Sequence, residues 1–111
     1  MRPEDRIRVM HMLEAAETVA TFIAGRDRLA LDQDRMLLFA LVRAMEIIGE
    51  AATKVSAETR QTAPAVPWRQ IMAMRNRLVH AYFDIDRDIL WKTATEEVPM
   101  VHALLSPMIE N

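Results

Sequence analysis

With 111 residues and no cysteine, the chain is limited to one domain without disulfides or thiolate-bound metals. Hydrophobic residues make up 51% and charged residues 27%, which is typical of a soluble globular protein, and only two residues are glycine. The formal net charge of −2 gives no indication of nucleic-acid binding from bulk electrostatics.

No part of the sequence predicts export or membrane insertion. The N-terminal segment Met1–Asp5 lacks the apolar run of a signal peptide. The longest apolar stretch, Met36 to Val42, is far too short to span a bilayer. We therefore expect a cytoplasmic protein, folded as a single domain over residues 1–111, that does not contact a membrane.

The first helix is predicted from about Pro3 to Ala24. Proline suits the first helical position, acidic residues suit the positive end of the helix dipole, and Gly25 is a natural stop. An apolar stripe at helical spacing should face the core, and it consists of Val9, Met12, Ala16, Val19 and Ile23.

The second helix is predicted from an N-cap at Asp32 to about Val55. It is apolar over most of its circumference near its start, which predicts a central position in the fold. Gly49, in its second half, would let another helix approach closely.

Glu46 and Glu50 stand one turn apart on this helix, and two interpretations stay open. Together with Arg43 they fit an exposed ladder of ion pairs along one helix face. Alternatively, a carboxylate of this pair is aimed across the bundle at Arg75 and orients it.

A polar break follows, in which Ser56 is expected to cap a short turn through Arg60. Proline at 64 and 67 forbids a continuous helix, and Trp68 should anchor the turn in the core.

The third helix is predicted over about Pro67 to Phe83. At about 100° per residue, one arc of it should face the core, formed by Ile71, Met74, Leu78 and Ala81. The polar residues Arg75, Asn76 and His80 fall off that arc and should lie together on one side of the helix.

A fourth helix should begin at Arg87 behind an N-cap at Asp86, and Pro99 should either kink it or start a fifth helix through about Met108. No stretch alternates long enough to predict a strand. The fold class is therefore predicted as an all-α, antiparallel bundle of four to five helices.

The residues Met74 to Tyr82 carry the densest set of reactive groups. The three histidines of the chain lie on different predicted helices, no paired-aspartate or metalloprotease pattern occurs, and a glycine-rich phosphate loop is absent. These observations argue against metal chemistry, and the lack of cysteine and of a serine in a Gly-x-Ser-x-Gly elbow argues against a protein nucleophile. A histidine can move protons and an arginine can hold a phosphate, so the two suffice for RNA cleavage through the 2′-hydroxyl.

Cleavage requires both a base and an acid, whereas this segment offers one histidine. A symmetric dimer would bring two copies together and supply both.

The run Arg75-Asn76-x3-His80-x-Tyr82 resembles the Arg-x4-His-x-Tyr motif of the HEPN superfamily, specifically of the HepT toxins. The similarity covers nearly the whole chain and extends to the flanking segments Ile48–Ala51, Val66–Trp68 and Phe83–Asp86 and to Trp91.

The resemblance implies a homodimeric helical bundle with a composite cleft between two motif segments. It implies a metal-independent endoribonuclease toxin that needs no cofactor. The implied partner is an MntA-type nucleotidyltransferase antitoxin, which neutralises the toxin by transferring AMP from ATP onto the motif tyrosine, Tyr82 in this chain.

By this resemblance Arg75 holds the scissile phosphate, His80 is the general acid and base, and Asn76 orients the substrate or His80. Glu46 and Glu50 are candidates for orienting Arg75, and Arg77 is a candidate for additional phosphate affinity. The alternative function is a non-catalytic HEPN protein that binds a minimal nucleotidyltransferase.

Overall fold

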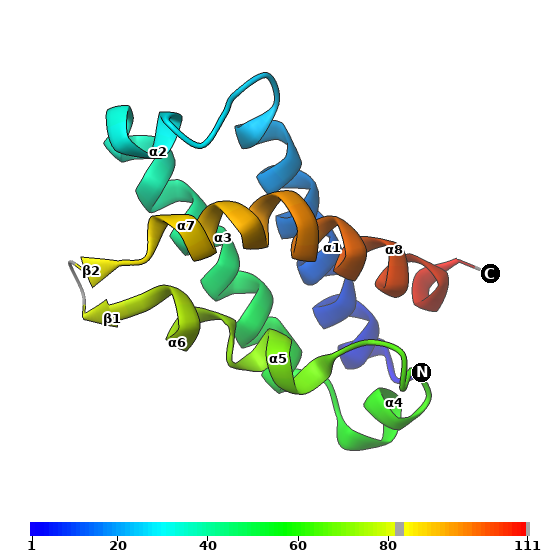
Figure 1. Ribbon diagram of the computed structural model, residues 1–111. Coiled ribbons are helices and arrows are strands. Elements are labelled where there is room, and N and C mark those ends of the chain that lie inside the picture. The colour runs from blue at the N-terminus through cyan, green and yellow to red at the C-terminus, as the bar shows by residue number, and fades with distance from the viewer. Residues whose placement is uncertain (82–83, 111) are drawn as a thin grey trace.

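The computed structural model describes residues 1–81 and 84–110 and confirms an all-α bundle. A two-stranded hairpin that the sequence did not predict interrupts the helices (Figure 1). In chain order the elements are α1 (Pro3–Ile23), α2 (Ala30–Gln33), α3 (Arg35–Lys54), α4 (Ala57–Gln61), α5 (Trp68–Met72), α6 (Met74–Leu78), β1 (Val79–Ala81), β2 (Asp84–Ile85), α7 (Arg87–Lys92), the π-helical turn η1 (Thr93–Glu97) and α8 (Val98–Ile109).

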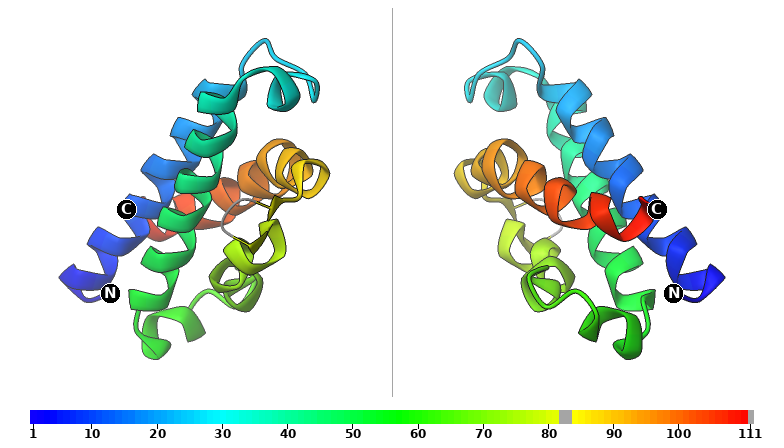
Figure 2. Two further views of the ribbon diagram at one scale, coloured as in Figure 1. Left: turned by 90° about the vertical axis from the view of Figure 1, so that its left-hand side faces the viewer. Right: turned by 90° about the vertical axis from the view of Figure 1, so that its right-hand side faces the viewer.

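The long helices α1 and α3 lie antiparallel and form the centre of the fold (Figures 1 and 2). Helix α1 ends within one residue of the prediction, and Gly25 follows it with φ 72°, a backbone conformation that glycine adopts at low cost. The N-cap predicted at Asp32 is wrong. Asp34 caps α3 by accepting a hydrogen bond from the Leu37 amide at 3.1 Å, whereas Asp32 belongs to the separate turn α2.

Helices α7 and α8 and the turn η1 form one continuous run that crosses the α1–α3 pair (Figure 2). Asp86 caps α7 by accepting from the Ile89 amide at 3.0 Å, which confirms the predicted cap. Of the two alternatives for Pro99, a kink or the start of a fifth helix, the structure has α8 beginning at Val98 with this proline in its first turn, although the helical backbone continues into it from α7 through η1. Proline has no N–H to donate to the preceding turn, and the chain widens there into η1.

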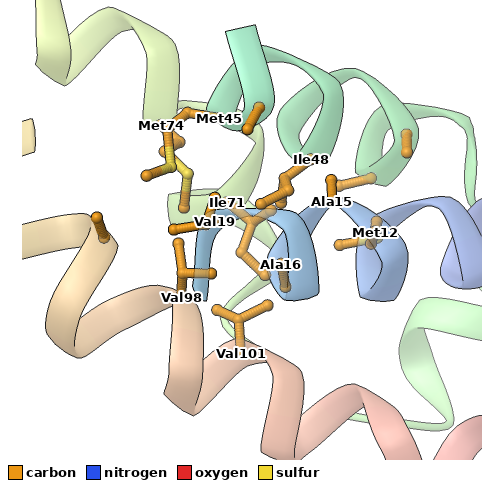
Figure 3. Packing of buried hydrophobic residues seen from close by; sticks show 14 of the residues in the cluster. Met12, Ala15, Ala16, Val19, Met45, Ile48, Ile71, Met74, Val98 and Val101 are labelled. Carbon is orange, nitrogen blue, oxygen red and sulfur yellow. The ribbon is translucent and has the colours of Figure 1, made fainter. Parts of the chain in front are cut away.

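The core lies where α1, α3, α5, α6 and the α7–α8 run meet (Figure 3). Val9, Met12, Ala16 and Val19 of the predicted α1 stripe are buried, and Ile23 is partly buried. From the chain's second half, Ile71, Met74 and Leu78 are fully buried as predicted, together with Leu90, Val98 and Val101.

The third helix predicted through Phe83 is wrong in its second half. The helix is broken at Ala73, resumes as α6 and ends at Leu78, after which Val79 pairs with Ile85 across an antiparallel hairpin. The Leu78 carbonyl accepts from the Asp86 amide at 2.8 Å, an interaction between chain segments that helical periodicity cannot reveal. Strands of three and two residues are also too short to show alternation.

A buried polar contact joins the start of α1 to α4. Asp5 is only 3% exposed and accepts from the Ser56 amide at 2.9 Å, the Ser56 hydroxyl at 2.7 Å and the Thr59 hydroxyl at 2.6 Å. The bond from Thr59 and the two from Ser56 lower the pKa of Asp5 to about 2. Ser56 also caps α4 through the Thr59 amide, which confirms the predicted cap.

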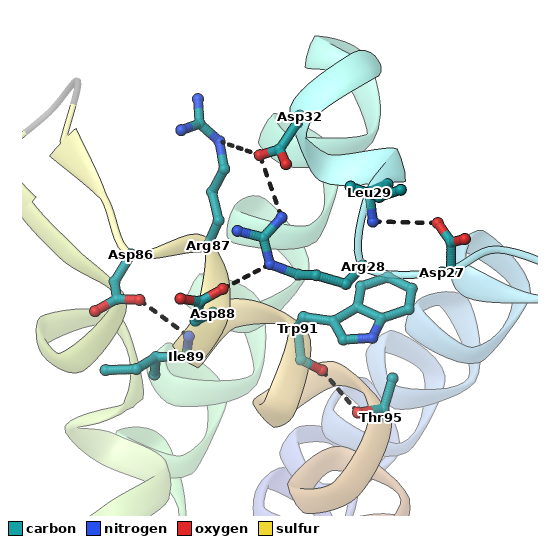
Figure 4. A network of polar contacts seen from close by, with 10 residues as sticks. All are labelled: Asp27, Arg28, Leu29, Asp32, Asp86, Arg87, Asp88, Ile89, Trp91 and Thr95. Atoms are coloured by element: carbon teal, nitrogen blue, oxygen red, sulfur yellow. Dashed lines mark hydrogen bonds and ion pairs between the residues drawn. The ribbon is translucent and has the colours of Figure 1, made fainter.

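A second polar network joins the α1–α2 connection to the start of α7 (Figure 4). Arg28 donates from Nε to Asp88 at 2.7 Å and lies 3.2 Å from Asp32 through Nη1. Arg87 lies 3.7 Å from the same Asp32 oxygen. The network contacts the first residues of α7, which follow directly after the hairpin.

None of the described helices is long and apolar enough to cross a membrane.

Candidate functional site

Arg75 stands on α6 and contacts α3. Its Nε donates to Glu46 Oε2 at 3.2 Å, and its side chain is 49% exposed. This contact confirms the interpretation in which Glu46 is aimed across the bundle. Because the contact uses Nε, the Nη groups with the remaining N–H donors are not consumed by it. Glu50 does not share this role, since it lies 3.9 Å from Arg43 on the exposed side of α3.

Gly49 allows this contact between α3 and the α5–α6 segment. A Cβ atom at position 49 would lie 3.1 Å from the Ile71 carbonyl oxygen and 3.7 Å from that of Met72. The predicted close approach is therefore confirmed, although the approaching group is the backbone at the end of α5. One turn before Gly49, Glu46 can reach Arg75 because the two segments are so close.

Asn76 is exposed beside Arg75, and both line a surface groove of about 160 Å³. The opposite wall is formed by α3 and includes Glu46, Glu50 and Thr53. The groove thus combines a guanidinium, a carboxamide, two carboxylates and a hydroxyl. Such a set can hold a phosphate at one end and donate to or accept from a polar group at the other.

His80 lies on β1 and not on a helix, so the prediction that it shares a helix side with Asn76 is wrong. The hairpin register shifts by one residue between Val79 and Ala81, which places His80 at a bulge-like irregularity. Irregularities of this kind redirect a side chain and are frequent next to active sites. The His80 side chain is 54% exposed, and its Nε2 lies 3.9 Å from Asp86 Oδ2.

Asp86 is held firmly at that position. Its Oδ1 accepts from the Ile89 amide at 3.0 Å, and its own amide donates to the Leu78 carbonyl at 2.8 Å. One carboxylate oxygen therefore caps α7 while the other faces His80. The sequence identified this residue only as a cap.

Arg77 points away from the groove and donates from Nη1 to Glu97 Oε1 on η1 at 3.1 Å. Burial alone would raise the pKa of Glu97, but hydrogen bonds from Arg77 and Thr93 outweigh it and lower the pKa below its usual value. This geometry fits a structural contact between α6 and η1 better than the phosphate contact expected for Arg77.

Tyr82, the predicted AMP acceptor, lies outside the described residues. Within the described part of the chain, no three histidine or acidic side chains gather closely enough to hold a metal ion.

The family model described as "Ribonuclease HepT-like" matches residues 12–108. The chain belongs to this family. The resemblance predicted from the motif is thereby confirmed, and Arg75, Asn76 and His80 all fall within the matched region.

Several relatives of this HepT-like chain have names that refer to RNase activity. A "Putative RNase" of Methanocaldococcus jannaschii is 39% identical over 90 residues, which cover 81% of this chain and 83% of that protein. A "Probable ribonuclease HepT" of Thermococcus cleftensis is 44% identical over 66 residues, 60% of each chain. A "Putative RNase" of Caldanaerobacter subterraneus subsp. tengcongensis is 32% identical over 101 residues, 91% of this chain and 90% of that protein. No solved structure matches the chain.

Sequence reasoning missed two neighbours of the HepT-like motif, Asp86 and Glu97. Asp86 follows His80 by six residues, but only a hairpin brings the two together. Glu97 is twenty residues from Arg77, and the π-helical turn presents it toward α6. Asp86 could be recognised from the sequence as the N-cap of α7, whereas no local sequence pattern indicates the contact of Glu97.

Proposed function

We propose that this HepT-like chain is a metal-independent RNA endonuclease that acts as the toxin of a HepT/MntA-type toxin–antitoxin pair. The observation that carries the proposal is the exposed Arg75, braced by Glu46 in a groove with Asn76, in a chain of the HepT-like ribonuclease family.

The proposed reaction uses the nucleophile of RNA itself. A base removes the proton of the 2′-hydroxyl, the 2′-oxygen attacks the adjacent phosphorus, and the bond from phosphorus to the 5′-oxygen breaks. An acid donates a proton to the leaving 5′-oxygen, so the products are a 2′,3′-cyclic phosphate and a 5′-hydroxyl. Arg75 holds the phosphate and stabilises the charge that develops on it.

His80 is the proposed proton carrier, and Asp86 is its positioning residue. The carboxylate faces His80 Nε2 at 3.9 Å and is held from behind by the α7 cap. One histidine cannot be base and acid in the same step. We therefore place the site between two copies of the chain, so that the second His80 supplies the other proton transfer.

Control by the antitoxin is proposed to act on Tyr82, two residues after His80. Transfer of AMP from ATP to the phenol oxygen forms a phosphodiester and releases pyrophosphate. The added negative charge would lie beside the position where an RNA phosphate must bind, and like charges repel it.

The nuclease is tested with the purified chain, a fluorescent RNA and a chelator. We expect wild type to release products that end in a cyclic phosphate, and His80→Ala to lose cleavage by at least about a hundredfold while helicity and molecular mass stay unchanged. His102→Ala is the matched control. His102 lies on α8 and contacts Glu17 of α1 at 2.9 Å, so this variant should cleave RNA normally.

Retained cleavage by His80→Ala would overturn the assignment. A wild-type chain that does not cleave RNA, yet co-purifies with a nucleotidyltransferase encoded beside it, would favour the alternative of a non-catalytic binding partner. Intact mass after co-expression then tests the control step: added AMP on wild type and none on Tyr82→Phe is the expected result.

A further inference from the structure

A second groove, of about 200 Å³, lies between α1 and α3. Its floor is apolar and its rim is charged. The lining residues are Arg8 and His11 from α1 and Arg43, Ile47, Glu50, Ala51 and Lys54 from α3.

The rim of this groove carries an excess of positive charge. Arg8, Arg43 and Lys54 are permanent cations, whereas Glu50 is the only carboxylate among the lining residues. Neither Arg8 nor Lys54 takes part in an ion pair with the described residues. The Arg43–Glu50 contact is 3.9 Å long and both side chains are more than 60% exposed, so it neutralises little. In a chain whose net charge is −2, this is a local reversal of sign.

The groove adjoins the candidate site. Glu50 lines both this groove and the one that contains Arg75 and Asn76. Lys54 lies about 12 Å along the axis of α3 from Glu46, the residue that contacts Arg75. A strand whose phosphate is held by Arg75 can therefore continue along α3 into the second groove.

Resting on the proposed ribonuclease function, we infer that the α1–α3 groove binds the RNA backbone beside the scissile phosphate, with Arg8 and Lys54 as its phosphate contacts. A polynucleotide stays charged along its whole length, so an adjoining groove with surplus cations lowers its free energy. The flexible cations contact phosphate and not base edges, so this groove contributes affinity independently of sequence.

The test uses the full chain with His80→Ala to prevent cleavage and a fluorescent single-stranded RNA as probe. Dissociation constants are measured over a range of salt concentrations for three proteins. One carries only His80→Ala, one adds Arg8→Gln and Lys54→Gln, and the third adds Arg69→Gln and Lys92→Gln, which remove equal charge from exposed positions outside the groove.

We expect the groove variant to lower the slope of log affinity against log salt by about 1.4, because each lost phosphate contact on a single strand is worth about 0.7. If the two proteins bind equally at about 1 M salt, this corresponds to about 25-fold weaker binding at about 0.1 M salt. The control variant should keep the slope of its parent. If Arg8→Gln disturbs α1, Lys54→Gln alone, at an exposed position, should lower the slope by about 0.7.

Equal effects of the groove and control variants would show that only net charge matters and would overturn the inference. The inference would also be overturned if the groove variant kept the salt slope of its parent but lost thermal stability. Lys54 would then act only by stabilising the C-terminus of α3 through the helix dipole. Loss of binding to the nucleotidyltransferase with intact RNA binding would assign the groove to a protein partner instead. Wild type that binds RNA through the groove without cleaving it would reject the proposed catalysis and leave the groove assignment standing.

Discussion

The contact between Asp5 and α4 makes the stability of the chain depend on pH. In the folded chain Asp5 has a pKa of about 2, against an ordinary value of 3.8. Since one pKa unit corresponds to about 1.4 kcal/mol, the ionised carboxylate stabilises the folded state by about 2 kcal/mol at neutral pH. The carboxylate is 3% exposed, so solvent screens this contribution little.

The sign follows from proton binding. The unfolded chain binds the Asp5 proton more tightly, so the contribution is complete above the ordinary pKa and is lost as the pH falls through about 4 toward about 2. At pH 3 about half of it should remain. Asp5→Asn keeps the size of the side chain but removes the charge, and should therefore lower the free energy of unfolding at pH 7 by about 2 kcal/mol.

Urea denaturation of wild type and Asp5→Asn at pH 7 and pH 3 measures this directly. The difference between the two proteins should shrink by about half at the lower pH. Glu4→Gln is the matched control, because it removes a charge from the same helical turn without touching Ser56 or Thr59. A difference between wild type and Asp5→Asn that is the same at both pH values would refute the assignment of the stabilisation to the charge.

Three further predictions follow from the contacts of the site. Gly49→Val should cost about 1–3 kcal/mol in thermal denaturation, because its Cβ would already lie 3.1 Å from a backbone carbonyl. Replacing both Arg77 and Glu97 by methionine should lower the free energy of unfolding less than Glu97→Ala alone. The single change leaves the half-buried Arg77 guanidinium without its carboxylate partner. Asp86→Asn should preserve the α7 cap yet lower kcat on the order of tenfold with little change in KM, whereas Asp34→Asn, at the equivalent cap of α3, should leave cleavage unchanged.

Features that depend on neighbours in sequence could be predicted. The start of α1, the cap at Ser56 and the cap at Asp86 follow from local chemistry, and the structure has all three. The contact between Glu46 and Arg75 was only one of two open interpretations, because helical spacing shows which side chains share a face but not which helix lies opposite.

The hairpin could not be predicted, because the apolar residues that precede it recur at helical spacing and predict that the helix continues. Met74 and Leu78 are buried at helical spacing, and α6 is indeed a helix up to Leu78. What ends it is pairing with a segment six residues further on, together with the bond from the Asp86 amide. Asp34 is the cap of α3 because it is the extended residue directly before the helix, whereas Asp32 lies within the separate turn α2.

The end of the helix at Leu78 bears on how the motif works. Four residues lie between Arg75 and His80, so in an uninterrupted helix the two side chains would point about 140° apart. The prediction that both lie together on one side of a helix is therefore wrong for this pair. A helix could therefore not have directed both groups to one phosphate within a chain. Because α6 ends between them, Arg75 is fixed by Glu46 and the close approach at Gly49, whereas the direction of His80 is set separately by the hairpin irregularity and by Asp86. The four residues between Arg75 and His80 thus include the end of α6 and the start of β1. Changes that extend the helix past Leu78 should abolish cleavage without unfolding the core.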